Sequence, residues 1–178
     1  NGQIQSSQFV AGVADVNWTI AAIADVNGDG MDDLVWRHRL TGQNYIYLLN
    51  GASVTQSYVL NTVPSPWRLV QAADVNGDGS DDLIWRNQTT GLNWLYLMSQ
   101  GRISQSLRLN SVADPLWHIV ATGDFDANGA DDLLWRHLQS GANAIYFMNQ
   151  GVIESSVVLK NTVPSPQWQV VTNTPLST

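Results

Sequence analysis

Hydrophobic and polar positions follow one recurring pattern along the chain, in which short apolar runs alternate with turns rich in Gly, Asn, Asp and Pro. In the clearest copy, this pattern predicts four strands, at Trp67–Asp74, Leu83–Asn87, Asn93–Met98 and Arg102–Leu109. β-Branched and aromatic residues dominate these runs. They do not alternate cleanly with polar residues, which indicates that both faces of the sheet are covered.

The four-strand pattern recurs about every fifty residues. Its copies align on glycine turns and divide a single domain, 1–178, into the units 1–49, 50–99, 100–149 and a partial 150–178. Four-stranded units of this length, stacked face to face around an axis, are propeller blades. We therefore predict an all-β propeller of four-stranded antiparallel blades.

The ends of the chain predict an incomplete ring. After three whole blades, only the last and first strands of a fourth are expected, at 2–10 and Trp168–Thr172. Three blades cannot close a ring, and open sheet edges promote aggregation. The chain is then a piece of a longer propeller, one of several copies that share the broken blade, or a small ring with four positions. We favour the first two, so the expected partner is a second copy or the remainder of a longer propeller.

Charge is concentrated in three short loops. The net charge is −7, and twelve of the 15 acidic residues lie in DVNGDGMDD (25–33), DVNGDGSDD (74–82) and DFDANGADD (124–132). One divalent cation in each loop would bring the formal charge to −1. No basic stripe is present to meet phosphates, so we do not expect nucleic acid as a partner.

Composition narrows the setting further. The sequence has no Cys, which excludes disulfides and thiolate metal sites. It has no apolar run near the roughly 20 residues that span a bilayer, so we expect no membrane insertion. The chain begins NGQIQSSQFV, without the pattern of an export signal, which is therefore absent or already removed. We expect a secreted or extracellular protein.

Each acidic loop has the spacing of a calcium site. Oxygen-bearing side chains occur at positions 1, 3, 5 and 9, glycine stands at position 6, and position 7 would offer a backbone carbonyl. The third loop exchanges acid and amide between positions 3 and 5. The expected metal ligands are Asp25, Asn27, Asp29, Met31 and Asp33; Asp74, Asn76, Asp78, Ser80 and Asp82; and Asp124, Asp126, Asn128, Ala130 and Asp132.

The alternative is that these loops are ordinary Asn-Gly and Asp-Gly hairpin turns. Turns require two or three such residues, not five oxygens in register in three copies. An EF-hand is excluded by the missing Glu at position 12 and by the flanking strands, and several converging oxygens favour Ca²⁺ over Mg²⁺. We therefore predict three Ca²⁺ ions, each needed to order a loop whose carboxylates otherwise repel one another.

The units resemble the FG-GAP or VCBS-type repeats of calcium-binding β-propellers. The resemblance lies in D-x-N-G-D-G-x-x-D-[LI]-x-W-R, followed by T-G and then [YL]-[LM]-N-G, and it covers nearly the whole chain. Such repeats occur in integrin alpha-subunit heads, in many secreted bacterial proteins and in a fungal seven-bladed lectin. The resemblance implies a calcium-binding propeller, and its members include adhesins, lectins and non-catalytic appendages of hydrolases.

A second set of residues is expected at the loop ends opposite the acidic loops, where aromatic rings beside polar donors could bind a sugar. The set comprises Trp67, Trp117, Trp168, Arg37, Arg86, Arg136, His38, Asn87, His137, Asn44, Asn93 and Asn143. Clefts between blades would repeat such a site and add avidity. Ala144 replaces the aromatic found at Tyr45 and Trp94, so the copies need not be equivalent.

Structural roles compete with this sugar hypothesis. The mid-strand Trp36, Trp85 and Trp135 are expected in the core between blades. The entry tryptophans at Trp18, Trp67, Trp117 and Trp168 could instead seal the blade tops. The arginines could instead pair with the extra loop acids Asp32, Asp81 and Asp131.

Catalysis has little support, because no Cys nucleophile and no carboxylate pair free of metal is evident. Two function classes remain. The first is a non-catalytic, calcium-stabilised module for carbohydrate binding or adhesion. The second is a structural propeller segment that completes its ring with other chains and binds no small ligand but calcium.

Overall fold

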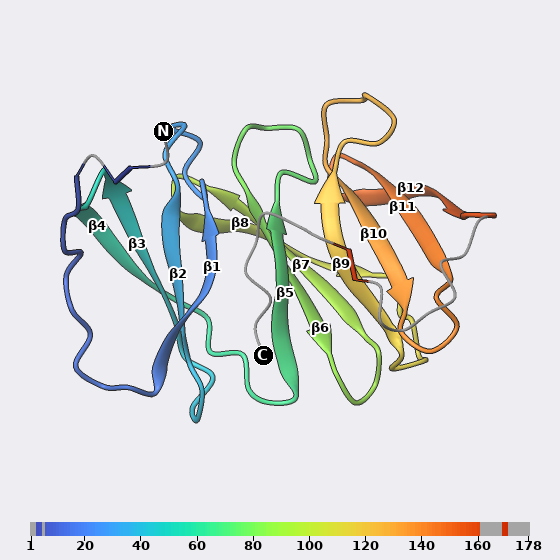
Figure 1. Ribbon diagram of the computed structural model, residues 1–178, viewed down its shortest axis with the longest axis horizontal. Coiled ribbons are helices and arrows are strands. Elements are labelled where there is room, and N and C mark those ends of the chain that lie inside the picture. Colours follow the sequence, from blue (N-terminus) through green and yellow to red (C-terminus); the bar gives the residue numbers. More distant parts are fainter. Residues whose placement is uncertain (1–2, 5, 161–168, 171–178) are drawn as a thin grey trace.

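The computed structural model describes residues 3–4, 6–160 and 169–170, in which twelve strands form three sheets. Each sheet is a four-stranded antiparallel meander, in the orders β1-β2-β3-β4, β5-β6-β7-β8 and β9-β10-β11-β12 (Figure 1). The strands are β1 Trp18–Ala24, β2 Asp33–His38, β3 Asn44–Asn50, β4 Ser53–Leu60, β5 Trp67–Ala73, β6 Asp82–Asn87, β7 Asn93–Ser99, β8 Arg102–Leu109, β9 Trp117–Gly123, β10 Asp132–His137, β11 Asn143–Asn149 and β12 Val152–Val158.

The predicted blades are confirmed. In the second sheet, the predicted and observed strand ends agree to within one residue, because glycine turns separate the four runs and a proline pair precedes the first. One such turn residue, Gly91, has a φ of +69°, which a residue with a side chain rarely adopts. The middle strand β6 is buried at every position, so both faces of this sheet are covered, as the unalternating pattern predicted.

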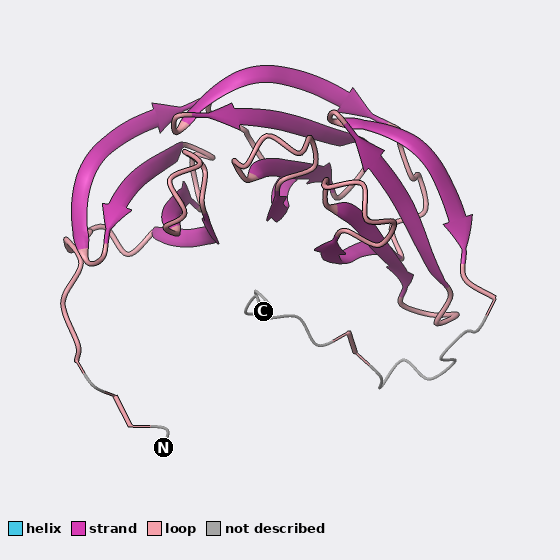
Figure 2. Cartoon of the chain, turned by 90° about the horizontal axis from the view of Figure 1, so that it is seen from above, coloured by secondary structure: helices cyan, strands magenta, loops and turns pink. Residues whose placement is uncertain are grey.

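The three sheets stand side by side along an arc that does not close within this chain (Figure 2). The first strands of neighbouring sheets contact one another, β1 with β5 and β5 with β9. Two apolar cores fill the spaces between sheets: Val35, Ile46 and Leu48 of the first sheet pack with Leu83, Trp85 and Met98 of the second. Ile84, Leu95 and Leu97 pack in the same way with Leu133, Trp135 and Met148 of the third.

The mid-strand tryptophans confirm this packing. Trp85 and Trp135 are 1% and 2% exposed and lie in the two cores, as predicted. Trp36, at the same position in the first sheet, is only half-buried. The difference arises because, within the described residues, no sheet covers the face of the first sheet that carries Trp36.

The strand predicted at 2–10 is not formed. Its described residues, 3–4 and 6–10, have no strand structure. The physical reason is that the fourth strand of each observed sheet pairs only with the third, and the described residues contain no third strand for this segment to pair with. The strand predicted at Trp168–Thr172 lies outside the described residues, except for residues 169–170, which also form no strand.

In the described part of the chain, no helix is long and apolar enough to cross a bilayer.

Candidate functional site

Each acidic loop joins the first and second strands of a sheet and is ordered by its first aspartate. In the second loop, Asp74 Oδ1 accepts the backbone N–H groups of Gly77 and Asp78 at 2.7 and 3.1 Å, and Oδ2 accepts that of Gly79 at 2.8 Å. Asp25 does the same in the first loop. One carboxylate thus fixes the bend and gathers the other acidic side chains of the loop around it.

The aspartate at position 9 is buried and only half satisfied. Asp82 is 0% exposed, and its Oδ1 accepts the backbone N–H of Met98 at 2.8 Å. Its Oδ2 accepts no hydrogen bond of normal geometry, and neither does Asp33 Oδ2 in the first loop. Burial has a larger effect on the two pKa values than the nearby backbone N–H groups of Val75 and Val26, which lower them. Burial, with the charges of nearby loop carboxylates, raises the pKa of Asp82 to about 8 and that of Asp33 to about 6. A cation bound beside these buried oxygens would stabilise the ionised form of the carboxylates.

The third loop brings carboxylates closest together. Oxygens of Asp124, Asp126 and Asp132 lie within 4.8 Å of one another, the only such cluster among the described residues. Asp132 Oδ1 accepts the Met148 N–H at 2.8 Å, as its counterparts do from the equivalent residue. Asp132 differs in that its Oδ2 also has a partner, the Phe125 N–H at 2.9 Å. The exchanged residue Asn128 donates its amide to the Met148 carbonyl at 2.8 Å. The third loop is therefore related to the first two but not identical.

The loop residues fit a hard cation such as Ca²⁺. In the first two loops the fit rests on the unpartnered oxygens of Asp33 and Asp82, and in the third on the carboxylate cluster. The side chains predicted as metal ligands at positions 1, 3 and 5 lie in the same loops as these unpartnered oxygens and this carboxylate cluster. Ligation by the carbonyls of Met31, Ser80 and Ala130 stays a prediction.

The eighth residue of a loop links neighbouring blades. The backbone N–H of Asp81 donates to the Asp25 carbonyl at 2.7 Å, and Asp81 Oδ2 accepts the Asp25 N–H at 2.9 Å. Asp131 N–H donates to the Asp74 carbonyl at 2.7 Å. Burial, followed by the charges of other loop aspartates, raises the pKa of Asp81 to about 6. The first residue of each of these two metal loops is therefore held by the next blade.

The proposed pairing of these acids with the recurring arginines is wrong for Arg37 and Arg86. Arg86 is 3% exposed and lies at the opposite end of its strand from the acidic loop. Its Nη1 donates to Gly91 O and Asn93 Oδ1 at 3.2 and 3.0 Å, and its Nη2 donates to Val112 O and Asp114 O at 2.8 and 3.2 Å. Arg86 thus joins its own turn to the loop that enters the next blade.

Arg37 repeats this arrangement one blade earlier. It donates to Gly42 O and Asn44 Oδ1, and across the blade boundary to Val63 O and Trp67 O at 2.7 and 3.0 Å. Its guanidinium carbon lies 5.1 Å from the centroid of a Trp85 ring. Arg136 makes the same contacts within its own turn, to Gly141 and Asn143. A planar fork with several donors suits this role, because it can donate to oxygens of two loops at once.

The asparagines of the expected sugar set are also used internally. Asn44 and Asn93 are each 1% exposed, and each donates to a carbonyl of the following loop at 2.7 Å. Asn87 accepts two backbone N–H groups of its turn, from Thr89 and Thr90. The side-chain donors of Arg37, Arg86, Asn44 and Asn93 are thus used within the chain, whereas the hydrogen bonds of Asn87 occupy only its side-chain oxygen. A sugar-binding role for these residues stays a prediction.

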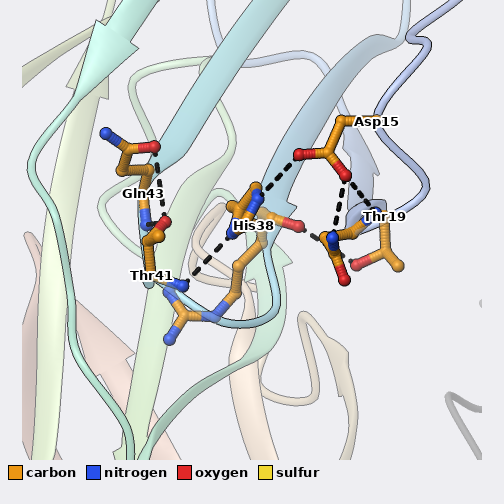
Figure 3. Close-up of polar contacts among 7 residues, drawn as sticks. Asp15, Thr19, His38, Thr41 and Gln43 are labelled. Atoms are coloured by element: carbon orange, nitrogen blue, oxygen red, sulfur yellow. Dashed lines mark hydrogen bonds and ion pairs between the residues drawn. The ribbon is translucent and has the colours of Figure 1, made fainter.

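The two histidines of the set each bridge two loops, and Figure 3 shows the bridge made by His38. His38 Nε2 lies 3.1 Å from Asp15 Oδ2, and its Nδ1 accepts the Thr41 N–H at 3.2 Å. Because a backbone N–H can only donate, Nδ1 is the acceptor and Nε2–H donates to Asp15. Trp18 packs edge-on against His38, with ring centroids 5.2 Å apart.

The third blade repeats this bridge with His137. Its Nε2 lies 3.1 Å from Asp114 Oδ2, and its Nδ1 accepts the Ser140 N–H at 3.0 Å. Trp117 takes the place of Trp18, with centroids 5.3 Å from the histidine ring. The pKa of Asp114 is lowered by the backbone N–H of Leu116 and then by His137.

Sequence reasoning missed Asp15 and Asp114, although a signal was present. Both occur in the segment Val-Ala-Asp before an entry tryptophan, and both units carry His at the end of WRH. The second unit has Pro-Ser-Pro before Trp67 and Asn87 in place of histidine. The two positions therefore change together within the chain, as contacting residues do. Of the remaining expected ligand residues, Trp168 lies outside the described residues, and Trp67 and Trp117 are partly buried against the two cores.

Repeated four-stranded sheets, each with an acidic loop after its first strand, define a β-propeller-like repeat module. Residues 25–85 and 74–135 match the FG-GAP-like repeat, and the chain belongs to this family. A comparison with curated proteins gives no match.

Proposed function

We propose that this FG-GAP-like module is a non-catalytic binding module stabilised by calcium. Asp25, Asn27, Asp29 and Asp33 would hold one Ca²⁺ in the first loop, Asp74, Asn76, Asp78 and Asp82 a second, and Asp124, Asp126, Asn128 and Asp132 a third. The observation that carries the proposal is the buried, unpartnered Oδ2 of Asp33 and Asp82, each beside further carboxylates. A bound divalent ion supplies the positive charge that these oxygens lack.

The proposed role of calcium is to order the arc of blades. Each loop bend is shaped by its first aspartate, and in the first two loops the backbone of that aspartate is bonded to the next blade through Asp81 or Asp131. An ion that fixes Asp25 or Asp74 therefore also fixes the contact between two blades. Metal binding and blade packing are expected to be coupled.

Thermal unfolding with and without calcium tests this proposal. The chain in millimolar CaCl₂ should unfold at a clearly higher temperature than in EDTA, and MgCl₂ at the same concentration should restore little of the difference. Isothermal titration with CaCl₂ should give about three sites. Equal stability in calcium and in EDTA would contradict the proposal.

Carbohydrate is the ligand class that we propose for the binding function. Support comes from the partly exposed tryptophans at the loop ends, each packed against a histidine: Trp18 with the buried His38, and Trp117 with the partly exposed His137. A glycan array run in calcium and in EDTA tests it, and specific binding in calcium is expected. The absence of binding to any glycan would favour the second candidate, a structural segment.

The second candidate is favoured by the open face of the first sheet. Trp36 is half-buried there, whereas Trp85 and Trp135 in the covered sheets are fully buried. Another copy of the chain, or further blades of a longer secreted propeller, would cover this face. Light scattering in calcium tests self-assembly, and a monomeric mass would exclude the second copy as the covering element.

A further inference from the structure

An open hollow of about 260 Å³ lies on the third sheet, beside the loop that enters it. Strands β10, β11 and β12 and the residues before β9 contribute its walls. The residues that matter here are Val112, Trp117, Trp135, Ala144, Tyr146 and Ser156. Three aromatic side chains therefore line a space that opens to solvent.

The second sheet shows what fills the equivalent space. There the residue at the position of Ala144 is Trp94, and its indole packs edge-on against Trp67 with ring centroids 6.5 Å apart. The Trp94 Nε1–H donates to Ser106 Oγ at 2.7 Å. The first sheet has Tyr45 at this position, in edge-on contact with Trp18.

The strand register makes these positions equivalent. Tyr96 pairs with Ser106 in the second sheet, and Tyr146 pairs with Ser156 in the third. Trp117 likewise stands at the start of β9, as Trp67 does at the start of β5. The third sheet thus keeps Trp117 and Ser156, the equivalents of the residues that contact Trp94 in the second sheet. It has the small side chain of Ala144 where the second sheet has the Trp94 indole.

We propose that this hollow binds a planar aromatic ring that carries an N–H donor, with indole as the simplest case. Trp117, Trp135 and Tyr146 would contact the ring, and Ser156 Oγ would accept its N–H as Ser106 does for Trp94. The volume suits one bicyclic ring, because an apolar cavity of about 150 Å³ already binds benzene and drug-sized sites begin near 300 Å³. The inference does not rest on the proposed calcium binding, and it shares only Trp117 with the proposed glycan contacts.

The choice of an aromatic ring over a sugar follows from what fills the equivalent space in the second sheet. The polar side-chain groups of this wall are Ser156 Oγ, the Tyr146 hydroxyl and the indole N–H groups of Trp117 and Trp135. The Trp135 N–H has no partner, but neither has that of Trp85 in the filled second sheet. The Trp135 N–H therefore does not indicate which ligand the hollow binds. The Trp94 indole, which fills the equivalent space in the second sheet, does.

Calorimetric titration of the full chain with indole, in calcium buffer, tests the proposal. The wild type should bind about one indole. Ala144→Trp should refill the hollow and abolish binding, with a thermal midpoint equal to or above that of the wild type to show that it is folded. Wild-type protein that binds no indole at millimolar concentration would overturn the proposal, as would unchanged binding by folded Ala144→Trp.

The chain also provides a matched gain of function. Trp94→Ala should create the same hollow in the second sheet and raise the number of bound indoles from one to two. If Ala144→Trp does not fold, this variant still decides, because an unchanged number of sites in folded Trp94→Ala would overturn the proposal.

The hydrogen bond is tested by removing either partner. Ser156→Ala should weaken indole binding about threefold to tenfold, and benzofuran, which has the shape of indole without the N–H, should bind the wild type more weakly by a similar factor. Equal binding of the two ligands would overturn the assigned donor. Displacement of indole by glucose at equal concentration would overturn the choice of an aromatic ligand.

Discussion

We expect the substitution Asp82→Asn to change the sign of its effect on stability when calcium is removed. Asp82 is fully buried, its Oδ1 accepts a backbone N–H, and its Oδ2 has no partner. The variant keeps the shape of the side chain and the first hydrogen bond but removes the charge. It therefore isolates the electrostatic cost of a buried carboxylate from the packing of the loop.

The magnitude follows from the pKa of Asp82, which is 3.8 as its ordinary value and about 8 in the folded, metal-free chain. Below pH 3.8 both states hold the proton and there is no cost. As the pH rises, the unfolded state releases the proton first, so the free energy of unfolding falls by about 1.4 kcal/mol per pH unit. This loss reaches at most about 4 kcal/mol at pH 7 and ends once the folded state also ionises.

Asparagine avoids this loss but leaves its own amide unpartnered, at a cost of about 1–3 kcal/mol. In EDTA at pH 7, the free energy of unfolding of Asp82→Asn should therefore be about 1–2 kcal/mol higher than that of the wild type. At pH 4 the charge costs the wild type less than about 1 kcal/mol, so the variant should instead be the less stable by about 1–2 kcal/mol. The comparison of EDTA with calcium is therefore decided at pH 7. In millimolar calcium the variant should be the less stable, because it has lost a charged ligand and binds the ion more weakly.

Urea denaturation at both pH values, in EDTA and in calcium, measures all four differences. Asp32→Asn is the matched control, because Asp32 is exposed and is not among the proposed ligands. That variant should change stability little in any of the four conditions. If Asp82→Asn destabilises the chain equally with and without calcium, both the buried charge and the proposed ion are refuted.

Three further predictions concern the links between blades. Arg86→Met should lower the free energy of unfolding by about 3 kcal/mol in urea denaturation, because four hydrogen bonds of a buried guanidinium are lost, and Arg86→Lys should recover little of it. Gly91→Ala should cost about 2 kcal/mol, because an added Cβ would lie 2.0 Å from a carbonyl oxygen. Gly51→Ala, where φ is also positive but the space is open, should cost less in the same assay. The stability that Asp114 contributes through its lowered pKa should be present above the ordinary Asp range and disappear as the pH falls through the folded value. An NMR titration of its carboxyl should show this lowered pKa and a rise toward the ordinary value in His137→Asn.

Local features of the sequence could be predicted because each is set by a few neighbouring residues. The ends of β5 to β8 follow from glycine turns and from runs of apolar residues. The positions of Trp85 and Trp135 in the cores follow from their place in mid-strand. The bends at Asp25 and Asp74 follow from side chains that accept N–H groups three to five residues further on.

Contacts between blades were harder to predict, because their partners lie far apart in the chain. Asp81 bonds to Asp25 at a separation of 56 residues, and Arg37 reaches Trp67 at a separation of 30. Sequence reasoning paired acids with arginines by charge. The fold places them at opposite ends of the strands and satisfies the arginines with neutral carbonyls instead. The strand predicted at 2–10 failed for a related reason, since a strand forms only where another strand is present to pair with it.

The sequence by itself determined the class of fold, the number of complete blades and the position of each acidic loop, because repetition within one chain makes the same local choices visible three times. Only the tertiary structure decided which polar groups remain available. Hydrogen bonds to the loops that lead into the next blade occupy Arg37, Arg86, Asn44 and Asn93. One oxygen of Asp33 and one of Asp82 remain unpartnered. Ala144 lies beside an open hollow. Whether a polar group is available to a ligand depends on the groups that surround it in space, and its neighbours in the sequence do not specify these.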